Sequence, residues 1–286
     1  MVSFKKDLNR FITTDYQQEL HTNMLRTVNF QEDFSGYQDL IFALGDSYTH
    51  GTGLPVDAAY PFQLDLMLNF NNGVYTKRYG VVNLGHDGIG GKQALCILKK
   101  YSACLKNPRF ILYQGCDNDY IDDFVYSELA QVMPFSGNPR VTGVLQWFVE
   151  HSETVATLYK VYFGHYRNQI ANHIRFSNRG ALQEPVLNEL KALADTLNAR
   201  LIITWADIYS EDAYYWVRSW AEKHDVLFAD WAKGVKSTEH ELSGIPLKNH
   251  HSAGHYRTWV NYIIARSFED KIKQVNDQVL TGNKGL

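Results

Sequence analysis

The chain has 286 residues, a net charge of −3 and a composition that is 45% hydrophobic and 21% charged, which is ordinary for a globular protein. So small a charge gives no reason to expect nucleic acid or an anionic membrane as a partner. The apolar runs are too short to span a bilayer, and the first residues, MVSFKKDLNRF, lack the apolar segment of a signal peptide. We therefore expect a cytoplasmic protein without a membrane span or a nucleic-acid partner.

Taken in chain order, the sequence begins with residues 1–36, which are polar with scattered aromatic residues. We interpret them as an N-terminal extension packed on the core. Five short apolar runs follow, and each of them ends in a glycine, an aspartate or another polar residue. They cover residues 39–45, 79–85, 109–115, 200–206 and 225–231. Continuous rather than alternating apolar character is typical of strands that are covered on both faces, as in a parallel sheet.

Segments with a helical period separate these runs. They cover residues 58–70, 92–105, 184–199, 211–224 and 252–272. The alternation predicts a three-layer α/β/α fold with a five-stranded, mainly parallel sheet and right-handed crossovers. We expect residues 1–286 to form a single domain, because the chain contains no repeat, no low-complexity tract and no linker rich in Pro, Gly or Ser.

Residues 120–180 are longer than a normal crossover and rich in aromatic residues. Their helical spacing predicts a helical insertion after the third strand. The insertion could cap a site at the carboxyl edge of the sheet, or it could be an extra helical layer.

The three cysteines have no paired spacing. Two of them, Cys96 and Cys104, fall in the predicted helix 92–105, and the third is Cys116. We interpret them as buried, reduced thiols rather than as a disulfide framework.

Four segments with potential chemistry follow the predicted strands or precede the last helix. They are GDS at 45–47, NLGHDG at 83–88, GCDND at 115–119 and LKNHHSAGH at 247–255. Ligands of open parallel sheets bind beyond the carboxyl ends of the strands. A serine, an imidazole and hydrogen-bond donors at that edge are what acyl transfer through a serine requires.

The order of these segments resembles the SGNH/GDSL hydrolase family of esterases and lipases. The resemblance implies a flavodoxin-like sheet, a nucleophile at Ser47, and an oxyanion hole formed by Ser47, Gly88 and Asn118. It implies a carboxylic ester as the substrate, such as a small acyl group on a carbohydrate, with lipids as the rival class, and neither a cofactor nor a metal. It leaves the oligomeric state open.

Two details depart from the pattern of the family. The third segment has one extra residue, so that either Asn118 or Asp117 occupies the asparagine position; we prefer Asn118, because a carboxylate would repel an oxyanion. In the last segment, no carboxylate stands two or three residues before His250 or His251. A Ser–His dyad or an atypical triad is therefore expected.

The family's base usually lies two residues before the cap of the last helix. With Ser252 as the expected cap, this spacing selects His250, and His251 is the alternative. His255 resembles a second histidine of the family that is usually structural. His251 and His255 could also share one helix face as zinc ligands, but no third ligand is evident.

Two other functions remain open at the level of the sequence. The first is an acyltransferase on the same scaffold, in which another alcohol replaces water. The second is a binding protein that kept the fold without the catalytic reaction.

Overall fold

The computed structural model describes residues 34–123, 179–241, 247–248 and 254–282, together with several positions between 151 and 165. Its centre is a five-stranded sheet with the order β4-β1-β5-β6-β7, and every neighbouring pair is parallel. The strands are β1 (Asp39–Gly45), β4 (Tyr79–Asn83), β5 (Phe110–Gly115), β6 (Arg200–Trp205) and β7 (Leu227–Phe228). The flavodoxin-like order confirms the predicted fold class, and the sheet is parallel throughout.

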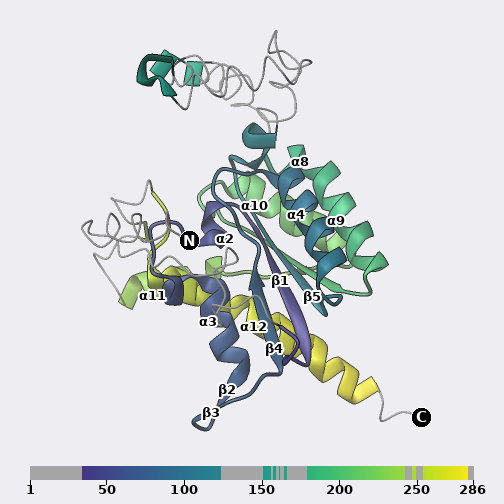
Figure 1. Ribbon diagram of the computed structural model, residues 1–286. Coiled ribbons are helices and arrows are strands. Elements are labelled where there is room, and N and C mark those ends of the chain that lie inside the picture. The colour runs from purple at the N-terminus through teal and green to yellow at the C-terminus, as the bar shows by residue number, and fades with distance from the viewer. Residues whose placement is uncertain are drawn as a thin grey trace.

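Helices cover both faces of this sheet (Figure 1). On one face, α3 (Tyr60–Asn69) packs along α12 (Thr258–Gly282). On the other face, α4 (Gly91–Cys104) packs against α9 (Glu184–Thr196). The residues of β4 and β5 are all buried, which explains the continuous apolar runs in the sequence.

Several short elements complete the described fold. They are α2 (Ser47–His50), the 3-10 helix η1 (Val56–Ala58), the hairpin of β2 (Phe70–Asn71) and β3 (Val74–Tyr75), α8 (Arg179–Leu182), α10 (Glu211–Lys223) and α11 (Ala232–Glu241). The hairpin lies where the sequence predicted only a connection. Among the described helices, none has a stretch long and apolar enough to cross a membrane.

The strand order places a switch point between β1 and β5. The chain leaves β1 toward β4 on one side and later returns to β5 on the other. In open parallel sheets, the crevice at such a point is where ligands bind. Ser47 follows β1 and Cys116 follows β5, so both lie at this crevice.

Two expectations about local structure are wrong. Cys96 and Cys104 are exposed rather than buried, because they lie on the solvent side of α4, and only Cys116 is a buried thiol; all three are free. The last helix begins at Thr258, six residues after the expected cap Ser252, and it ends at Gly282. The glycine at position 254, with φ at +84°, lies in a turn before this start.

Residues 1–33, most of the predicted insertion at 120–180, and the histidines His250 and His251 lie outside the described residues. The single-domain organisation and the role of the insertion therefore stay predictions.

Candidate active site

Ser47 is presented at the tip of β1 by a tight turn. A Cβ atom added to Gly45 would lie 2.6 Å from the carbonyl oxygen of Gln114 and 2.3 Å from Oγ1 of Thr49, so only glycine fits there. Asp46 follows as the N-cap of α2, and its Oδ1 accepts a hydrogen bond of 2.9 Å from the backbone N–H of Tyr48. Ser47 is therefore the first residue of α2 and is half-buried.

The imidazole that reaches Ser47 is that of His255. Its Nε2 lies 2.7 Å from Ser47 Oγ, although the two residues are 208 positions apart in the sequence. This is the distance at which a histidine takes the proton of a serine. The sequence interpretation had given His255 a structural role.

Aromatic packing holds the segment that carries His255. The ring of Tyr48 lies 5.0 Å from the imidazole and 4.9 Å from the ring of Tyr256. Tyr256 is buried, packs edge-on against Trp231, and donates its hydroxyl proton to the carbonyl of Ala206. These contacts fix the backbone next to His255 against the sheet edge at β6.

The observed start of α12 explains why the sequence did not predict the contact between His255 and Ser47. A base two residues before the cap was expected, and the cap was placed at Ser252. With the helix starting at Thr258, the preceding residue is Arg257, and two residues before it is His255. The same spacing therefore points to His255 once the helix boundary is known, and the signal in the sequence was the GH pair at 254–255.

A buried cluster of Asp46, Cys116 and Asp119 lies beneath the serine. The thiol of Cys116 is 3.0 Å from Asp46 Oδ2 and 3.2 Å from Asp119 Oδ1, and Asp46 Oδ2 also lies 3.2 Å from Ser47 Oγ. Asp119 accepts further hydrogen bonds from the Tyr113 hydroxyl, at 2.8 Å, and from the Cys116 backbone.

Burial dominates the electrostatics of this cluster. It raises the pKa of Asp46, which its hydrogen bonds and the positive charge of His255 partly oppose. Burial, reinforced by the charge of Asp46, raises the pKa of Asp119 well above its usual value. Burial and the two carboxyl groups also raise the pKa of the Cys116 thiol. Because the carboxyl groups of Asp46 and Asp119 are buried close together, ionisation of both at the same time is disfavoured.

Asp46, Cys116 and Asp119 each offer one carboxylate oxygen or sulfur atom, and these three atoms lie within 4.8 Å of one another. A metal ion could bind atoms at this spacing. A thiol ligand binds metal as the thiolate, however, and the environment of Cys116 disfavours deprotonation. In the structure, these residues contact one another through hydrogen bonds.

The two candidates in the third segment have different surroundings. Both carboxylate oxygens of Asp117 are engaged away from the serine, by Trp205 Nε1 at 2.9 Å and by Arg179 Nη1 at 2.8 Å. The amide of Asn118 is oriented at both ends: its Oδ1 accepts from the Cys116 thiol at 2.8 Å, and its Nδ2 donates to Asp122 at 2.6 Å. Among the described residues, no acceptor contacts the second N–H of this amide, so it can donate to another acceptor.

The glycine-rich loop after β4 packs directly against these segments. A Cβ atom at Gly85 would lie 2.4 Å from the backbone nitrogen of His50, and one at Gly90 would lie 2.3 Å from the carbonyl of Asp119. Between these two contacts, Gly88 is exposed and adopts a φ of +68° with open space where a side chain would stand. The loop therefore runs between α2 and residues 119–123, with Gly88 at its outer turn.

Comparisons with known proteins find matches among solved structures. No family model matches the sequence, and no curated protein matches it either. The chain is similar in structure to proteins described as lipolytic and of the G-D-S-L family. One from Veillonella parvula is 11% identical, with 80% of this chain and 94% of that chain covered and a TM-score of 0.45.

Two further matches carry names of enzymes. A catalytic mutant of an acetylxylan esterase from Geobacillus stearothermophilus is 16% identical, with 83% of this chain and 95% of that chain covered and a TM-score of 0.48. A phospholipase A1 from Streptomyces albidoflavus is 14% identical, with 81% and 99% covered and a TM-score of 0.45.

Proposed function

We propose that the protein is a serine esterase that cleaves a carboxylic ester through an acyl-enzyme on Ser47, with His255 as the base. The observation that carries the proposal is the 2.7 Å contact between Ser47 Oγ and His255 Nε2 at the switch point of the sheet. His255 takes the role that the sequence interpretation gave to His250 or His251.

In the first half of the reaction, Ser47 Oγ forms a bond to the carbonyl carbon while its proton passes to His255 Nε2. The tetrahedral intermediate then expels the alcohol, which takes this proton from His255, and the acyl group stays on Ser47. In the second half, water attacks the acyl-enzyme and gives a proton to His255, which returns it to Ser47 as the carboxylic acid leaves.

In the tetrahedral intermediate, the negative charge on the former carbonyl oxygen needs hydrogen-bond donors. We assign them to the backbone N–H groups of Ser47 and Gly88 and to the side-chain amide of Asn118. The fixed orientation of Asn118 and the open position of Gly88 support this assignment. Loss of one such donor typically costs about 10²–10³ in kcat.

The positive charge on His255 during the reaction also needs compensation. The residues two and three positions before His255 are Ala253 and Ser252, so no carboxylate stands there in the sequence. The carboxyl group of Asp46 is close enough for its pKa to respond to the charge of His255. We assign it the electrostatic part of the role that the third member plays in a Ser-His-Asp triad.

Hydrolysis of p-nitrophenyl acetate tests the proposal, combined with labelling by a fluorophosphonate and mapping of the labelled peptide. We expect the wild type to hydrolyse the ester and to carry the label on Ser47, and the Ser47→Ala variant to do neither. A wild-type protein that shows neither hydrolysis nor labelling would contradict the proposal and favour a binding protein.

A further inference from the structure

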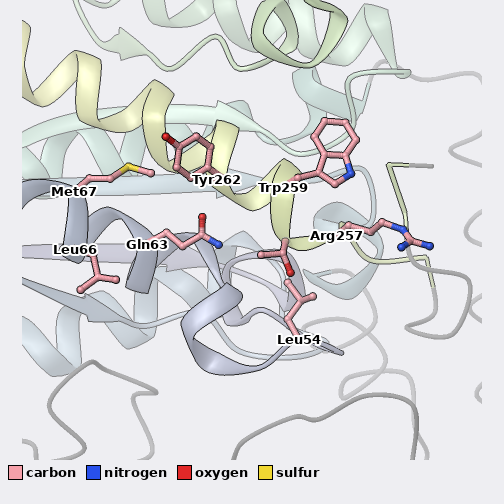
Figure 2. Close-up of a pocket in the computed structure, with 8 residues that line it drawn as sticks. Leu54, Gln63, Leu66, Met67, Arg257, Trp259 and Tyr262 are labelled. Carbon is pink, nitrogen blue, oxygen red and sulfur yellow. The ribbon is translucent and has the colours of Figure 1, made fainter. Parts of the chain in front are cut away.

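A groove of about 640 Å³ lies between α3 and the start of α12, and it is separate from the Ser47–His255 contact itself. Figure 2 shows its lining residues, which come from the two helices and from the loop that holds Leu54. On α3 they are Gln63, Leu66 and Met67, which share one face because they are three and four positions apart. On α12 they are Thr258, Trp259 and Tyr262, which are spaced in the same way.

Each wall of the groove contains a residue that is close in the sequence to Ser47 or His255. The chain runs from Ser47 through α2 to Leu54, and the turn is closed by hydrogen bonds from the Gly51 N–H to Ser47 O at 3.0 Å and from the Leu54 N–H to Gly51 O at 3.1 Å. On the other wall, Arg257 is two residues after His255 and begins the lining from that side. Each wall therefore starts close in the sequence to Ser47 or to His255.

The side of the base is where the alcohol of an ester must leave. His255 has to give its proton to the leaving oxygen, so this oxygen must come within hydrogen-bond reach of Nε2. The group attached to that oxygen then projects from the His255 side of the carbonyl carbon. The lining residues nearest to His255 in the sequence are Arg257, Thr258 and Trp259.

We propose that the groove binds the alcohol part of the ester and that this alcohol is bulky and largely apolar, such as an alkyl or arylalkyl group. This inference rests on the proposed function and names the substrate class of the same site. It differs from the carbohydrate ester that the family resemblance implies.

The chemistry of the lining supports an apolar ligand with few polar atoms. Leu54, Leu66, Met67, Trp259 and Tyr262 provide aliphatic and aromatic surface. Among the described residues, three buried polar atoms of the lining have no hydrogen-bond partner: Gln63 Oε1, Arg257 Nε and Trp259 Nε1. These three atoms can pair with only a few polar atoms of a ligand, whereas a sugar ring carries many hydroxyl groups that each need a partner.

Two series of esters test the proposal. One keeps the acyl group as acetate and lengthens the alcohol from ethyl to octyl; the other keeps ethanol and lengthens the acyl group. In the wild type we expect kcat/KM to rise by up to about fourfold for each methylene added to the alcohol, until the groove is full.

The Tyr262→Ser and Leu66→Arg variants should flatten the alcohol series and keep the ratio between long and short acyl groups. Both side chains are partly exposed, at 51% and 39%, so we expect the fold to tolerate the changes. The matched control is Tyr215→Ser on α10, since Tyr215 is 52% exposed and lies outside the groove. It should leave both series as in the wild type.

If the wild type hydrolyses esters but its kcat/KM does not change with the length of the alcohol, the inference is overturned and the proposed function still stands. The same holds if the variants flatten the acyl series instead, or if acetylated sugars exceed octyl acetate in kcat/KM. Absence of hydrolysis for all esters would be a failure of the proposed function.

A binding measurement tests the groove independently of turnover. Benzyl alcohol is titrated into the Ser47→Ala variant while the indole N–H signal of Trp259 is followed by NMR, after assignment with Trp259→Phe. We expect a saturable shift of this signal that Leu66→Arg abolishes and Tyr215→Ser does not. An unchanged Trp259 signal would show that the groove does not bind the alcohol.

Discussion

The hydroxyl proton of Ser47 has two acceptors within reach. Nε2 of His255 lies 2.7 Å away and Oδ2 of Asp46 lies 3.2 Å away. The shorter contact favours transfer to the imidazole. Once the proton has moved, the carboxylate of Asp46 faces a cation, and its attraction stabilises the charged pair. Asp46 caps α2, and in the proposed mechanism it also assists proton transfer.

The Asp46→Asn variant separates these two roles. An asparagine is an equally good N-cap, so α2 should persist, but the negative charge near His255 is lost. We expect kcat for p-nitrophenyl acetate to fall by roughly tenfold, the equivalent of one pKa unit of charge interaction, with little change in KM. The midpoint of urea unfolding should stay the same or rise, because burial disfavours the charge of Asp46. If the kcat of Asp46→Asn equals that of the wild type, the charge of Asp46 plays no part in catalysis.

At the scale of elements, the position of α2 depends on its contact with the loop after β4. The closest approach is at Gly85, where a Cβ atom would meet the backbone of His50 at 2.4 Å and that of Thr49 at 2.7 Å. Backbone atoms cannot rotate away as a side chain can. Any side chain at position 85 must therefore move either α2, which carries Ser47, or the loop that carries Gly88.

The Gly85→Ala variant tests this coupling. We expect a loss of about 1–3 kcal/mol in the free energy of unfolding, typical of overpacking, and a clear fall in kcat. Gly73→Ala is the control, because Gly73 has a positive φ of +80° but open space around it. That change should cost about 1 kcal/mol from the backbone alone and leave kcat unchanged. Equal activity of both variants would mean that α2 does not need this contact.

Asp123 joins three segments near the site. Its Oδ1 accepts a hydrogen bond of 2.7 Å from the Lys92 N–H in the first turn of α4, and its Oδ2 lies 3.4 Å from Nε2 of Gln183, which precedes α9. Burial raises the pKa of Asp123 to about 6. A carboxyl group whose pKa is raised in the folded state stabilises the protein at low pH and loses that contribution as the pH rises.

We therefore expect the free energy of unfolding of the wild type to fall relative to that of Asp123→Asn between pH 4 and pH 7. The difference should be on the order of 2 kcal/mol, since the unfolded carboxyl has a pKa of about 3.9. Urea unfolding of both proteins across this range measures it. A constant difference between the two proteins would show that Asp123 does not titrate abnormally.

At the scale of the whole molecule, the sequence predicts the sheet well and the last helix poorly. The run 39–45 matches β1 residue for residue, because strands buried on both faces leave a continuous apolar signal. Of the run 225–231, only Leu227 and Phe228 form a strand, β7. This strand lies at the edge of the sheet and pairs with β6 alone. Helix boundaries carry weaker signals, and here the serine at 252 looked like a cap while the helix starts at Thr258.

That boundary decided the assignment of the site. The position of Ser47 at the sheet edge could be predicted, because this residue follows a strand that is clear in the sequence. The contact of His255 with Ser47 could not be predicted, since His255 lies in a segment whose position depends on tertiary contacts, such as those of Tyr256 with Tyr48 and Trp231. A further contact between distant parts of the chain, Asn261 Oδ1 with the Tyr60 N–H at 3.1 Å, ties the start of α12 to α3.

The central claim is that two residues far apart in the sequence, Ser47 and His255, form one reacting pair. The rate of fluorophosphonate labelling at Ser47 measures it most directly, since this step needs the nucleophile and its base but no particular substrate. We expect His255→Ala to slow labelling by at least about 10²-fold, while His250→Ala and His251→Ala label at close to the wild-type rate. Labelling of His255→Ala at the wild-type rate, with loss in His250→Ala or His251→Ala, would contradict the account.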